Sequence, residues 1–356
     1  MKAAFWNKRM DISVNETEEP VPGPDQVKVQ VKWCGLCGSD IHEYLGGPIA
    51  IPEDEPHPLT GKKAPVILGH EVSGDVIEVG KDVTNLSVGD RVVVEPLVMC
   101  GECPACREDK YNLCEKLGFL GLCGIGGGFA EYLTYPARYV HKMPDHMTYE
   151  QGALVEPVAV AVHSLKVGGF KIGQNALVIG AGPIGLLTVT TLKAAGAAQV
   201  FVVQRKSDRQ RLAKIAGADA VFDPAECDAA EEIKRRTGGG VDIAFEVTGS
   251  KSGFDIGMKS LRYAGTFVIT SIWEEEISVN LNDIVYPEIN IVGTISSVKN
   301  FPMTIKLIAD GRINADYVVT SKIHLDEIVE KGIDVLTGPE KKKHAKILVT
   351  PDERLL

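Results

Sequence analysis

The sequence predicts a two-domain α/β protein, with a β-rich first domain followed by a domain built on a parallel, doubly wound sheet. Short β-branched segments such as "VKVQVKWCG", "VSGDVIEVG" and "GDRVVVEP" alternate with Gly and Pro turns in the N-terminal part. Beyond it, apolar strand candidates such as "NALVIG" and "VDIAFEVTG" alternate with helical spacers, a pattern typical of a parallel sheet covered by helices. The chain has 356 residues, which is long enough for two hydrophobic cores.

We place the first domain at residues 1–158, including a four-cysteine lobe at about 98–116, and the parallel-sheet domain at 159–298. Residues 299–356 end in the apolar segment "HAKILVTP", a strand expected to return to the first domain. Residues 45–65 are proline-rich without a clear period and are predicted to form a long surface loop.

The composition excludes several classes of protein. Acidic residues outnumber Lys and Arg by 48 to 38, giving a net charge of -10, which argues against nucleic-acid and membrane partners. The run "KKKH" at 341–344 is interpreted as a solvated face. No segment approaches the roughly 18 apolar residues of a membrane span, and "MKAAFWNKRMDISV" lacks a signal-peptide core, so we expect a cytoplasmic protein. Its eight cysteines are then expected to be metal ligands or buried apolar residues.

The segment "VIGAGPIG" has GxGxxG spacing directly after a strand and at the start of a helix. The glycines permit a tight turn, close approach of the backbone to a pyrophosphate and close helix packing, while the helix N-terminus favours phosphate. This context predicts a dinucleotide site. Its residues are Gly180, Gly182, Pro183, Ile184 and Gly185.

The coenzyme is indicated by the residue about 20 positions beyond the last glycine, where an acidic side chain would bind the ribose 2′-hydroxyl of NAD. That position holds Gln204, followed by Arg205, Lys206 and Arg209, which are potential partners of a 2′-phosphate. We therefore favour NADP or dual use over NAD alone. The alternative is that these cations are solvated residues of the next helix and that Gln204 binds a 2′-hydroxyl.

Four cysteines, Cys100, Cys103, Cys106 and Cys114, have the spacing CxxCxxCx7C. Four thiolates complete a tetrahedral zinc shell and leave no position for substrate, so we predict a structural zinc site. An iron–sulfur cluster is the alternative, but the bacterial ferredoxin pattern has three residues before its last cysteine and a proline after it. Here seven residues intervene, and Glu115 follows.

A catalytic metal site must leave a coordination position open, and its ligands are sought elsewhere. Taken separately, Cys34 and Cys37 could be core residues or a CxxC redox pair, and His70 could be an ordinary buried histidine. The nearby glycine-flanked "GHE" favours a metal site. The segments "CGLCGSDIH" and "ILGHEVSG" supply Cys37, Ser39, Asp40, His42, His70 and Glu71.

These segments, together with "VGDRVVVEP", the four-cysteine lobe, "LVEPVAVAVH" and "VIGAGPIG", resemble the zinc-containing medium-chain alcohol dehydrogenase family over essentially the whole chain. The resemblance implies a GroES-like catalytic domain, a Rossmann domain and two zinc ions per chain. Within the family, "CGLCGSDIHEYLGGPI", "QGALVEPVAVAVH", "GGGVDIAFEVTG" and "SIWE" look most like 2,3-butanediol dehydrogenases, with sorbitol-type polyol dehydrogenases as the next relatives.

The resemblance also implies residue roles. Cys37, His70 and Glu156 would bind the catalytic zinc, with Glu71 as the alternate ligand. Glu156 departs from the family's two-cysteine sites, because it stands where those enzymes have their second cysteine. Asp40 would orient His70.

Hydride transfer between NAD(P) and a secondary alcohol, vicinal diol or hydroxyketone is the implied activity, with 2,3-butanediol, acetoin or diacetyl as substrate. Ser39 and His42 would carry the released proton to solvent, and Thr248 and Ile272 would contact the coenzyme. The family commonly forms dimers or tetramers, and "SIWEEEISVNL" is predicted to be a paired edge strand.

Two other classes share this fold. A zincless quinone or enoyl reductase normally lacks the catalytic Cys and His, which this chain retains. A non-enzymatic protein on the same fold would not need a full catalytic set.

Overall fold

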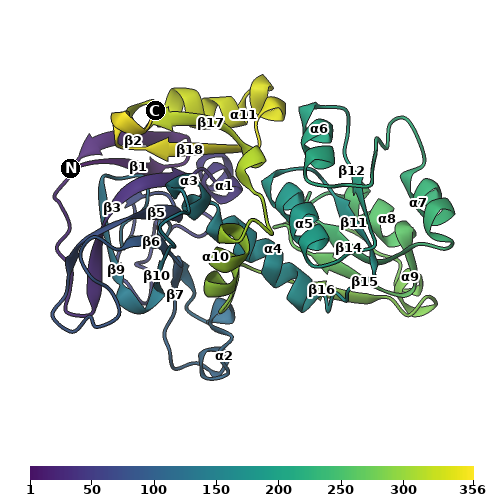
Figure 1. The fold of residues 1–356 in the computed structure, drawn as a ribbon, viewed down its shortest axis with the longest axis horizontal. Helices are drawn as coiled ribbons and strands as arrows, with labels where there is room; N and C mark the ends of the chain where they lie inside the picture. The colour runs from purple at the N-terminus through teal and green to yellow at the C-terminus, as the bar shows by residue number, and fades with distance from the viewer. The chain divides into compact units, whose positions relative to one another are not determined.

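The computed structural model describes residues 1–356, and the chain divides into two compact units (Figure 1). Unit 1 comprises residues 1–156, 301–311 and 319–356, and unit 2 comprises residues 157–300 and 312–318. The short segment 312–318 thus groups with unit 2, although residues 299–356 were predicted to return to the first domain. No helix in the structure combines the length and the apolar character needed to cross a bilayer.

Unit 1 is β-rich, in agreement with its short segments bounded by Gly and Pro. Its largest sheet has the strand order β10–β6–β5–β3–β18–β17, and β9 also pairs with β3. A three-stranded sheet β2–β1–β4 and a two-stranded sheet β7–β8 complete the unit. The strands are β1 (Lys2–Lys8), β2 (Asp11–Glu16), β3 (Gln26–Gly35), β4 (Val66–Ile67), β5 (Glu71–Val79), β6 (Arg91–Val94), β7 (Leu97–Val98), β8 (Gly118–Phe119), β9 (Tyr132–Pro136), β10 (Val140–Lys142), β17 (Val319–His324) and β18 (Lys346–Thr350).

Short helices and one long irregular segment connect these strands. Residues 47–65 contain no helix or strand, as expected for the predicted loop. The helix α4 (Val155–Val167) begins in unit 1 and continues into unit 2. The other helices of unit 1 are α1 (Gly38–Gly46), α2 (Pro104–Arg107), α3 (Tyr149–Ala153), α10 (Phe301–Ala309) and α11 (Asp334–Thr337).

The strand β3 organises unit 1. Its β-branched residues Val27, Val29 and Val31 are buried in the hydrophobic core, where such side chains fit a pleated surface well. It pairs with β5, β9 and β18, and its contact with β18 falls at Cys34 and Gly35. The C-terminal strand therefore joins the sheet at the end of β3 that leads into the predicted metal ligands.

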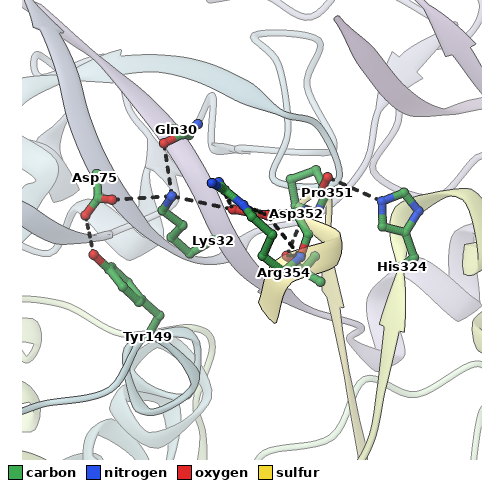
Figure 2. A network of polar contacts seen from close by, with 9 residues as sticks. Gln30, Lys32, Asp75, Tyr149, His324, Pro351, Asp352 and Arg354 are labelled. Atoms are coloured by element: carbon green, nitrogen blue, oxygen red, sulfur yellow. Dashed lines mark hydrogen bonds and ion pairs between the residues drawn. The ribbon is translucent and has the colours of Figure 1, made fainter. Parts of the chain in front are cut away.

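Polar contacts also hold the C-terminal turn to this sheet (Figure 2). Nζ of Lys32 on β3 lies 3.6 Å from Oδ2 of Asp75 on β5. It also lies 3.9 Å from Oδ2 of Asp352, just beyond β18. Arg354 donates two hydrogen bonds to Asp352 and so lowers the pKa of that carboxyl to about 2. The returning strand is thus fixed both by its backbone ladder and by charge.

Unit 2 confirms the predicted parallel, doubly wound sheet. All of its strand pairs are parallel, in the order β13–β12–β11–β14–β15–β16, with helices between consecutive strands. Its strands are β11 (Asn175–Ile179), β12 (Gln199–Val203), β13 (Ala220–Phe222), β14 (Val241–Glu246), β15 (Leu261–Ile269) and β16 (Asn290–Gly293). Its helices are α5 (Pro183–Ala194), α6 (Asp208–Ile215), α7 (Ala229–Thr237), α8 (Lys251–Ser260) and α9 (Asn282–Val285).

Residues 271–281, predicted as an edge strand paired in an oligomer, contain no strand within one chain, and the sheet of unit 2 ends at β16. A strand that pairs only with a second chain has no hydrogen-bonded partner within a single chain. Pairing of this segment between subunits therefore stays a prediction.

Candidate active site and metal centres

Cys37 is fixed at the start of α1 by Asp40. The chain leaves β3 at Gly35 and enters α1 with Cys37 in an extended conformation at the N-cap. One carboxylate oxygen of Asp40 accepts a hydrogen bond from the Cys37 N–H at 2.9 Å. Because Asp40 is fully buried, this bond sets the position of the thiol relative to the sheet.

His70 enters the same place from the turn between β4 and β5. Gly69 has φ +96°, and a Cβ there would lie 2.8 Å from both the Cys34 Sγ and the Phe129 N, so only glycine fits this turn. Nδ1 of His70 lies 3.8 Å from Oδ1 of Asp40, and both atoms lack a hydrogen-bond partner. Asp40 therefore stands beside the ring nitrogen that it was predicted to orient.

Glu71, the first residue of β5, is held by a buried lysine from the C-terminal strand. Lys346 Nζ donates to Glu71 Oε1 at 2.5 Å and to the Leu36 carbonyl at 2.8 Å. The other oxygen, Oε2, has no partner. It occupies the space beside Gly35, where a Cβ would lie 1.9 Å from it. One oxygen of Glu71 is thus paired with a cation, and the other is left free.

Cys37, His70 and Glu71 offer ligand atoms that all lie within 4.8 Å of one another. Thiolate, imidazole and carboxylate are all zinc donors, and a catalytic zinc site uses three protein ligands and keeps a further position open. The unpartnered Glu71 Oε2 is a buried donor atom without a hydrogen bond. These residues therefore fit a catalytic zinc ion.

Glu156, predicted as the third ligand, lies outside this three-donor cluster but acts on it electrostatically. It is the second residue of α4 and only 8% exposed. Burial, with a contribution from the charge of Glu71, raises the pKa of Glu156 to about 7. Burial also raises the pKa of Asp40. Burial would favour a neutral His70, but the negative charges of Asp40, Cys37 and Glu156 together outweigh that effect and raise the pKa of His70 to about 10. The site is short of positive charge, which suits a divalent cation.

Ser39 and His42, the predicted proton carriers, lie on α1. The Ser39 hydroxyl is 3.2 Å from Nε2 of His70. Both side chains are partly exposed, so α1 carries one hydroxyl at the donor cluster and one imidazole with access to water.

The four cysteines of the lobe form a second cluster, in which all four Sγ atoms lie within 4.8 Å of one another. Sγ of Cys100 is 3.9 Å from that of Cys106 and 3.6 Å from that of Cys114. A tetrahedral site with Zn–S bonds of about 2.3 Å has S···S edges of about 3.8 Å, whereas a disulfide bond is about 2.05 Å long. The geometry fits a closed zinc shell, and a multi-iron cluster would need its cysteines farther apart. All eight cysteines of the chain are unpaired.

Backbone N–H groups stabilise negative charge on these sulfurs. The Cys103 N–H donates to the Cys100 Sγ at 3.3 Å. Hydrogen bonds from the N–H groups of Glu115 and Cys106 lower the pKa of Cys103 to about 6. Burial and the neighbouring sulfurs raise the pKa of Cys106 to about 12. All four thiolates can therefore coexist only around a cation.

The lobe is anchored to the large sheet through Glu95, which is only 2% exposed. Tyr111 of the lobe donates to Glu95 Oε1 at 2.5 Å, and His141 of β10 lies 2.9 Å from Glu95 Oε2. A metal that orders the lobe therefore also orders this contact.

The glycine turn of unit 2 has the geometry that a dinucleotide site requires. Gly180 has φ +103°, and a Cβ on Gly185 would lie 2.0 Å from the Gly180 carbonyl oxygen. Gly182 is the N-cap of α5, and a Cβ there would meet only open space. Pro183 and Ile184 form the first turn of that helix. Free backbone N–H groups at a helix N-terminus beside open space fit a pyrophosphate.

Gln204, the predicted coenzyme discriminator, contacts the glycine turn. Its Oε1 accepts a hydrogen bond from the Ala181 N–H at 2.8 Å, and its Nε2 donates to the Arg205 carbonyl at 3.0 Å. Arg205 is exposed, while Arg209 is partly buried, and this burial lowers its pKa.

Thr248 and Ile272, the remaining predicted coenzyme residues, follow β14 and β15. Because the strands are parallel, both lie at the sheet edge that also carries the glycine turn. A Cβ on Gly180 would approach Thr248 Cγ2 to 2.6 Å, and Ile272 is 61% exposed.

Lys346 and Glu246 are buried charged residues near these sites that were not predicted. A signal for Lys346 was present, since lysine is almost never fully buried unless it is paired, and this one interrupts the apolar run "AKILV". Glu246 stands at the end of the apolar strand "VDIAFE" and gives a similar signal.

Unit 1 carries two donor clusters that fit zinc, and unit 2 carries a turn that fits a dinucleotide. A chain that combines these sites has the features of a zinc-dependent oxidoreductase. Family models agree with this class. Residues 23–145 match the alcohol dehydrogenase GroES-like domain, and residues 183–310 match the zinc-binding dehydrogenase domain.

Full-length relatives and solved structures agree as well. The chain is 48% identical to the (R,R)-butanediol dehydrogenase of Bacillus subtilis strain 168 over 99% of this chain and 100% of that protein. It is 35% identical to the sorbitol dehydrogenase of the same organism, over 99% and 98%. The crystal structure of the Bacillus subtilis 2R,3R-butanediol dehydrogenase matches with a TM-score of 0.93 at 48% identity, covering 99% of both chains. A putative zinc-binding dehydrogenase from Sinorhizobium meliloti 1021 bound to NADP matches with a TM-score of 0.89 at 33% identity, over 98% and 99%.

The chain belongs to the zinc-binding alcohol dehydrogenase family. The predicted family, the GroES-like and Rossmann-type fold and the oxidoreductase class are thereby confirmed. The zincless reductases and the non-enzymatic alternative are disfavoured, because the chain retains both zinc-binding clusters.

The lobe generates the first prediction. Cys103→Ser should lower the bound zinc from two ions per chain to one and lower the thermal midpoint, because it opens the closed shell. Zinc content by elemental analysis and thermal unfolding measure this. Cys227→Ser, outside both clusters, is the control and should change neither quantity. Retained zinc and stability with loss of kcat alone would refute the structural assignment.

The buried ion pair generates the second prediction. Lys346→Met leaves the Glu71 carboxylate buried without its cation and should reduce the free energy of unfolding by about 3–5 kcal/mol. Urea unfolding with and without added zinc measures the change. Lys322→Met, which removes a largely exposed pair with Glu150, is the control and should cost less than about 1 kcal/mol. The double variant Glu71→Gln/Lys346→Met should recover part of the loss, and equal losses in both lysine variants would contradict the prediction.

Proposed function

We propose that this chain is an NAD(P)-dependent zinc dehydrogenase that interconverts secondary alcohols or vicinal diols with the corresponding ketones, most specifically 2,3-butanediol, acetoin and diacetyl. The observation that carries the proposal is the buried cluster of Cys37, His70 and Glu71, whose donors fit a zinc ion with an open position. The full-length similarity to proteins named (R,R)-butanediol dehydrogenase supports the substrate.

The proposed zinc ligands are Cys37, His70 and Glu156, with Glu71 as the exchanging alternate. Lys346 already compensates the charge of Glu71, whereas Glu156 forms no such ion pair, and burial raises its pKa to about 7. Zinc held there would act as a Lewis acid toward the substrate oxygen and favour its deprotonated form near neutral pH. Asp40 keeps the His70 ring oriented toward the site.

The protein's own residues would handle the proton. In oxidation, a bound NAD(P) would supply the hydride acceptor, and the proton of the substrate hydroxyl would have to leave the site. Ser39 is placed to accept that proton, since its hydroxyl lies beside His70, and His42 on the same helix would release it to water. In reduction, the same residues deliver the proton in the opposite direction.

The proposed coenzyme is NADP, or NADP and NAD with similar efficiency. Gln204 replaces the acidic residue that would bind a free 2′-hydroxyl, and Arg205 and Arg209 follow it. The pyrophosphate would lie on the N-terminus of α5 at Gly182, with Thr248 and Ile272 at the same sheet edge.

A sorbitol-type polyol dehydrogenase is the second candidate, supported by the 35% identity to a sorbitol dehydrogenase. The loop predicted at residues 45–65 and Trp273, which follows the proposed coenzyme residue Ile272, are the proposed contributors to substrate choice. We further place the protein in the cytoplasm, where its unpaired cysteines stay reduced, and propose a homodimer or homotetramer.

Steady-state kinetics on both stereoisomers of butanediol, acetoin, diacetyl and sorbitol, with NAD(H) and NADP(H), test the function. The expected result is a kcat/KM for a butanediol isomer and acetoin that exceeds the value for sorbitol by at least tenfold. A preference for sorbitol selects the second candidate, and turnover of quinones or enoyl substrates without bound zinc refutes both.

His70→Ala or Cys37→Ala provides the third prediction. Removing a ligand of the catalytic zinc should lower kcat/KM by roughly three orders of magnitude, because Lewis-acid stabilisation is worth several kcal/mol. The lobe zinc and the fold, followed by elemental analysis and circular dichroism, should be retained. Near-normal turnover would eliminate this cluster as the catalytic site.

Gln204→Glu provides the fourth prediction. The new carboxylate keeps the acceptor for the Ala181 N–H and should raise kcat/KM for NAD relative to NADP by roughly tenfold, because it accepts from a 2′-hydroxyl and repels a 2′-phosphate. Kinetics with both coenzymes measure the ratio. Gln199→Glu, at the opposite end of β12, is the control and should leave the ratio unchanged. An unchanged ratio in Gln204→Glu would remove this residue as the discriminator.

A further inference from the structure

Glu246 is a fully buried carboxylate at the carboxyl end of β14, and none of the roles described above uses it. In the sheet it pairs with Ile179, the last residue of β11. The strand order of unit 2 reverses between β11 and β14, and open α/β sheets bind their ligands in the crevice at such a switch point. Glu246 therefore lies at the base of the expected coenzyme crevice.

Two loops donate hydrogen bonds to this carboxylate. Oε1 accepts from the Thr248 N–H at 2.7 Å and from the Thr248 hydroxyl. Oε2 accepts from the Gly249 N–H at 3.2 Å and from the Ser271 hydroxyl. All four donors are uncharged, and together they offset the cost of burying a carboxylate. The loop after β14 and the loop after β15 are thus joined through one side chain.

The first of these loops packs directly on the glycine turn. A Cβ on Gly180 would approach Thr248 Cγ2 to 2.6 Å, so the Thr248 side chain packs closely against the glycine turn. Gly249 takes φ +62°, and the Ser250 hydroxyl then accepts from the Gly253 N–H and caps α8. A shift of Thr248 would therefore change the rim of the crevice.

The strand order of unit 2 indicates which half of the coenzyme these loops would contact. A dinucleotide site consists of two mononucleotide halves, and the residue that selects the adenosine ribose lies at the end of the second strand. Here that residue is Gln204, after β12. The loops held by Glu246 follow β14 and β15 in the other half of the sheet, which leaves them the nicotinamide mononucleotide.

We propose that Glu246 is a positioning residue for the nicotinamide half of the coenzyme. Lying beneath the crevice, it acts through residues 247–250 and 270–272, whose relative position its carboxylate sets. The inference rests on the proposed use of NAD(P) and adds a residue that determines how the coenzyme is held.

Glu246→Gln is the test. An amide offers only one acceptor oxygen, so the N–H of either Thr248 or Gly249 loses its acceptor and faces an NH2 group instead. Fluorescence titration should show the Kd for NADPH or NADH raised at least about tenfold. The second probe is ADP, or its 2′-phosphorylated form if the wild type prefers NADPH. Its Kd should stay within about twofold of the wild-type value, because this probe occupies only the adenosine half of the site.

Asp242→Asn is the matched control. Asp242 lies at the opposite end of the same strand, where its carboxylate accepts the Asn175 N–H at 2.7 Å and pairs with Arg262. The substitution removes a comparable structural carboxylate away from the crevice and should leave both affinities within about twofold. Equal losses in the two variants, or equal weakening of NAD(P)H and ADP in Glu246→Gln, would overturn the inference, because they would show only a general loosening of the unit.

Ser271→Ala decides the matter if Glu246→Gln fails to fold. It removes one donor without introducing a new unsatisfied group and should raise the Kd for the reduced coenzyme about threefold, again with ADP unchanged. An unchanged Kd in Ser271→Ala would then refute the inference. A wild-type protein that binds neither NADH nor NADPH would instead refute the proposed function, so the two failures are distinguishable.

Discussion

Burial of negative charge at the end of β3 is the constraint on which the catalytic cluster depends. Asp40 and Glu71 are fully buried and Glu156 nearly so, while Lys346 supplies a buried cation from the last strand of the chain. Such charges are stable only when they are paired or hydrogen-bonded. The C-terminal strand is therefore part of the site, and the charge that it leaves uncompensated is what makes the cluster suited to zinc.

The two metal centres differ in how much of the shell the protein fills. The lobe places four sulfurs at the corners of one tetrahedron, so a metal there can only stabilise the loop and, through Glu95, its contact with the sheet. The donors of the other centre come from the turn after β3, the turn before β5 and β5 itself, and they leave room for a reactant. Buried carboxylates fix two of the loops by accepting hydrogen bonds from backbone N–H groups. Asp40 accepts from the N–H of Cys37, and Glu246 accepts from the N–H of Thr248.

Much of the fold was predictable because local patterns and tertiary structure agree. The alternation of apolar strands with helical spacers predicted the parallel sheet. Gly180 and Gly185 predicted the turn between β11 and α5, where the structure leaves no room for a side chain. Pairing of residues 271–281 with a second chain stays a prediction. The local patterns did not indicate that residues 312–318 group with unit 2, because membership of a unit depends on distant contacts that no local pattern encodes.

The sequence by itself determined the chemical inventory: four closely spaced cysteines for a closed shell, Cys37 and His70 for an open one, and a glycine turn for a dinucleotide. Spacing sufficed there because the ligands of the lobe are close along the chain. Only the tertiary structure decided how distant charges combine. It brought Lys346 to Glu71 across 275 residues, placed Glu71 rather than Glu156 beside Cys37 and His70, and set Glu246 beneath two loops. Such contacts depend on strand pairing and burial, which bring together residues far apart in the chain.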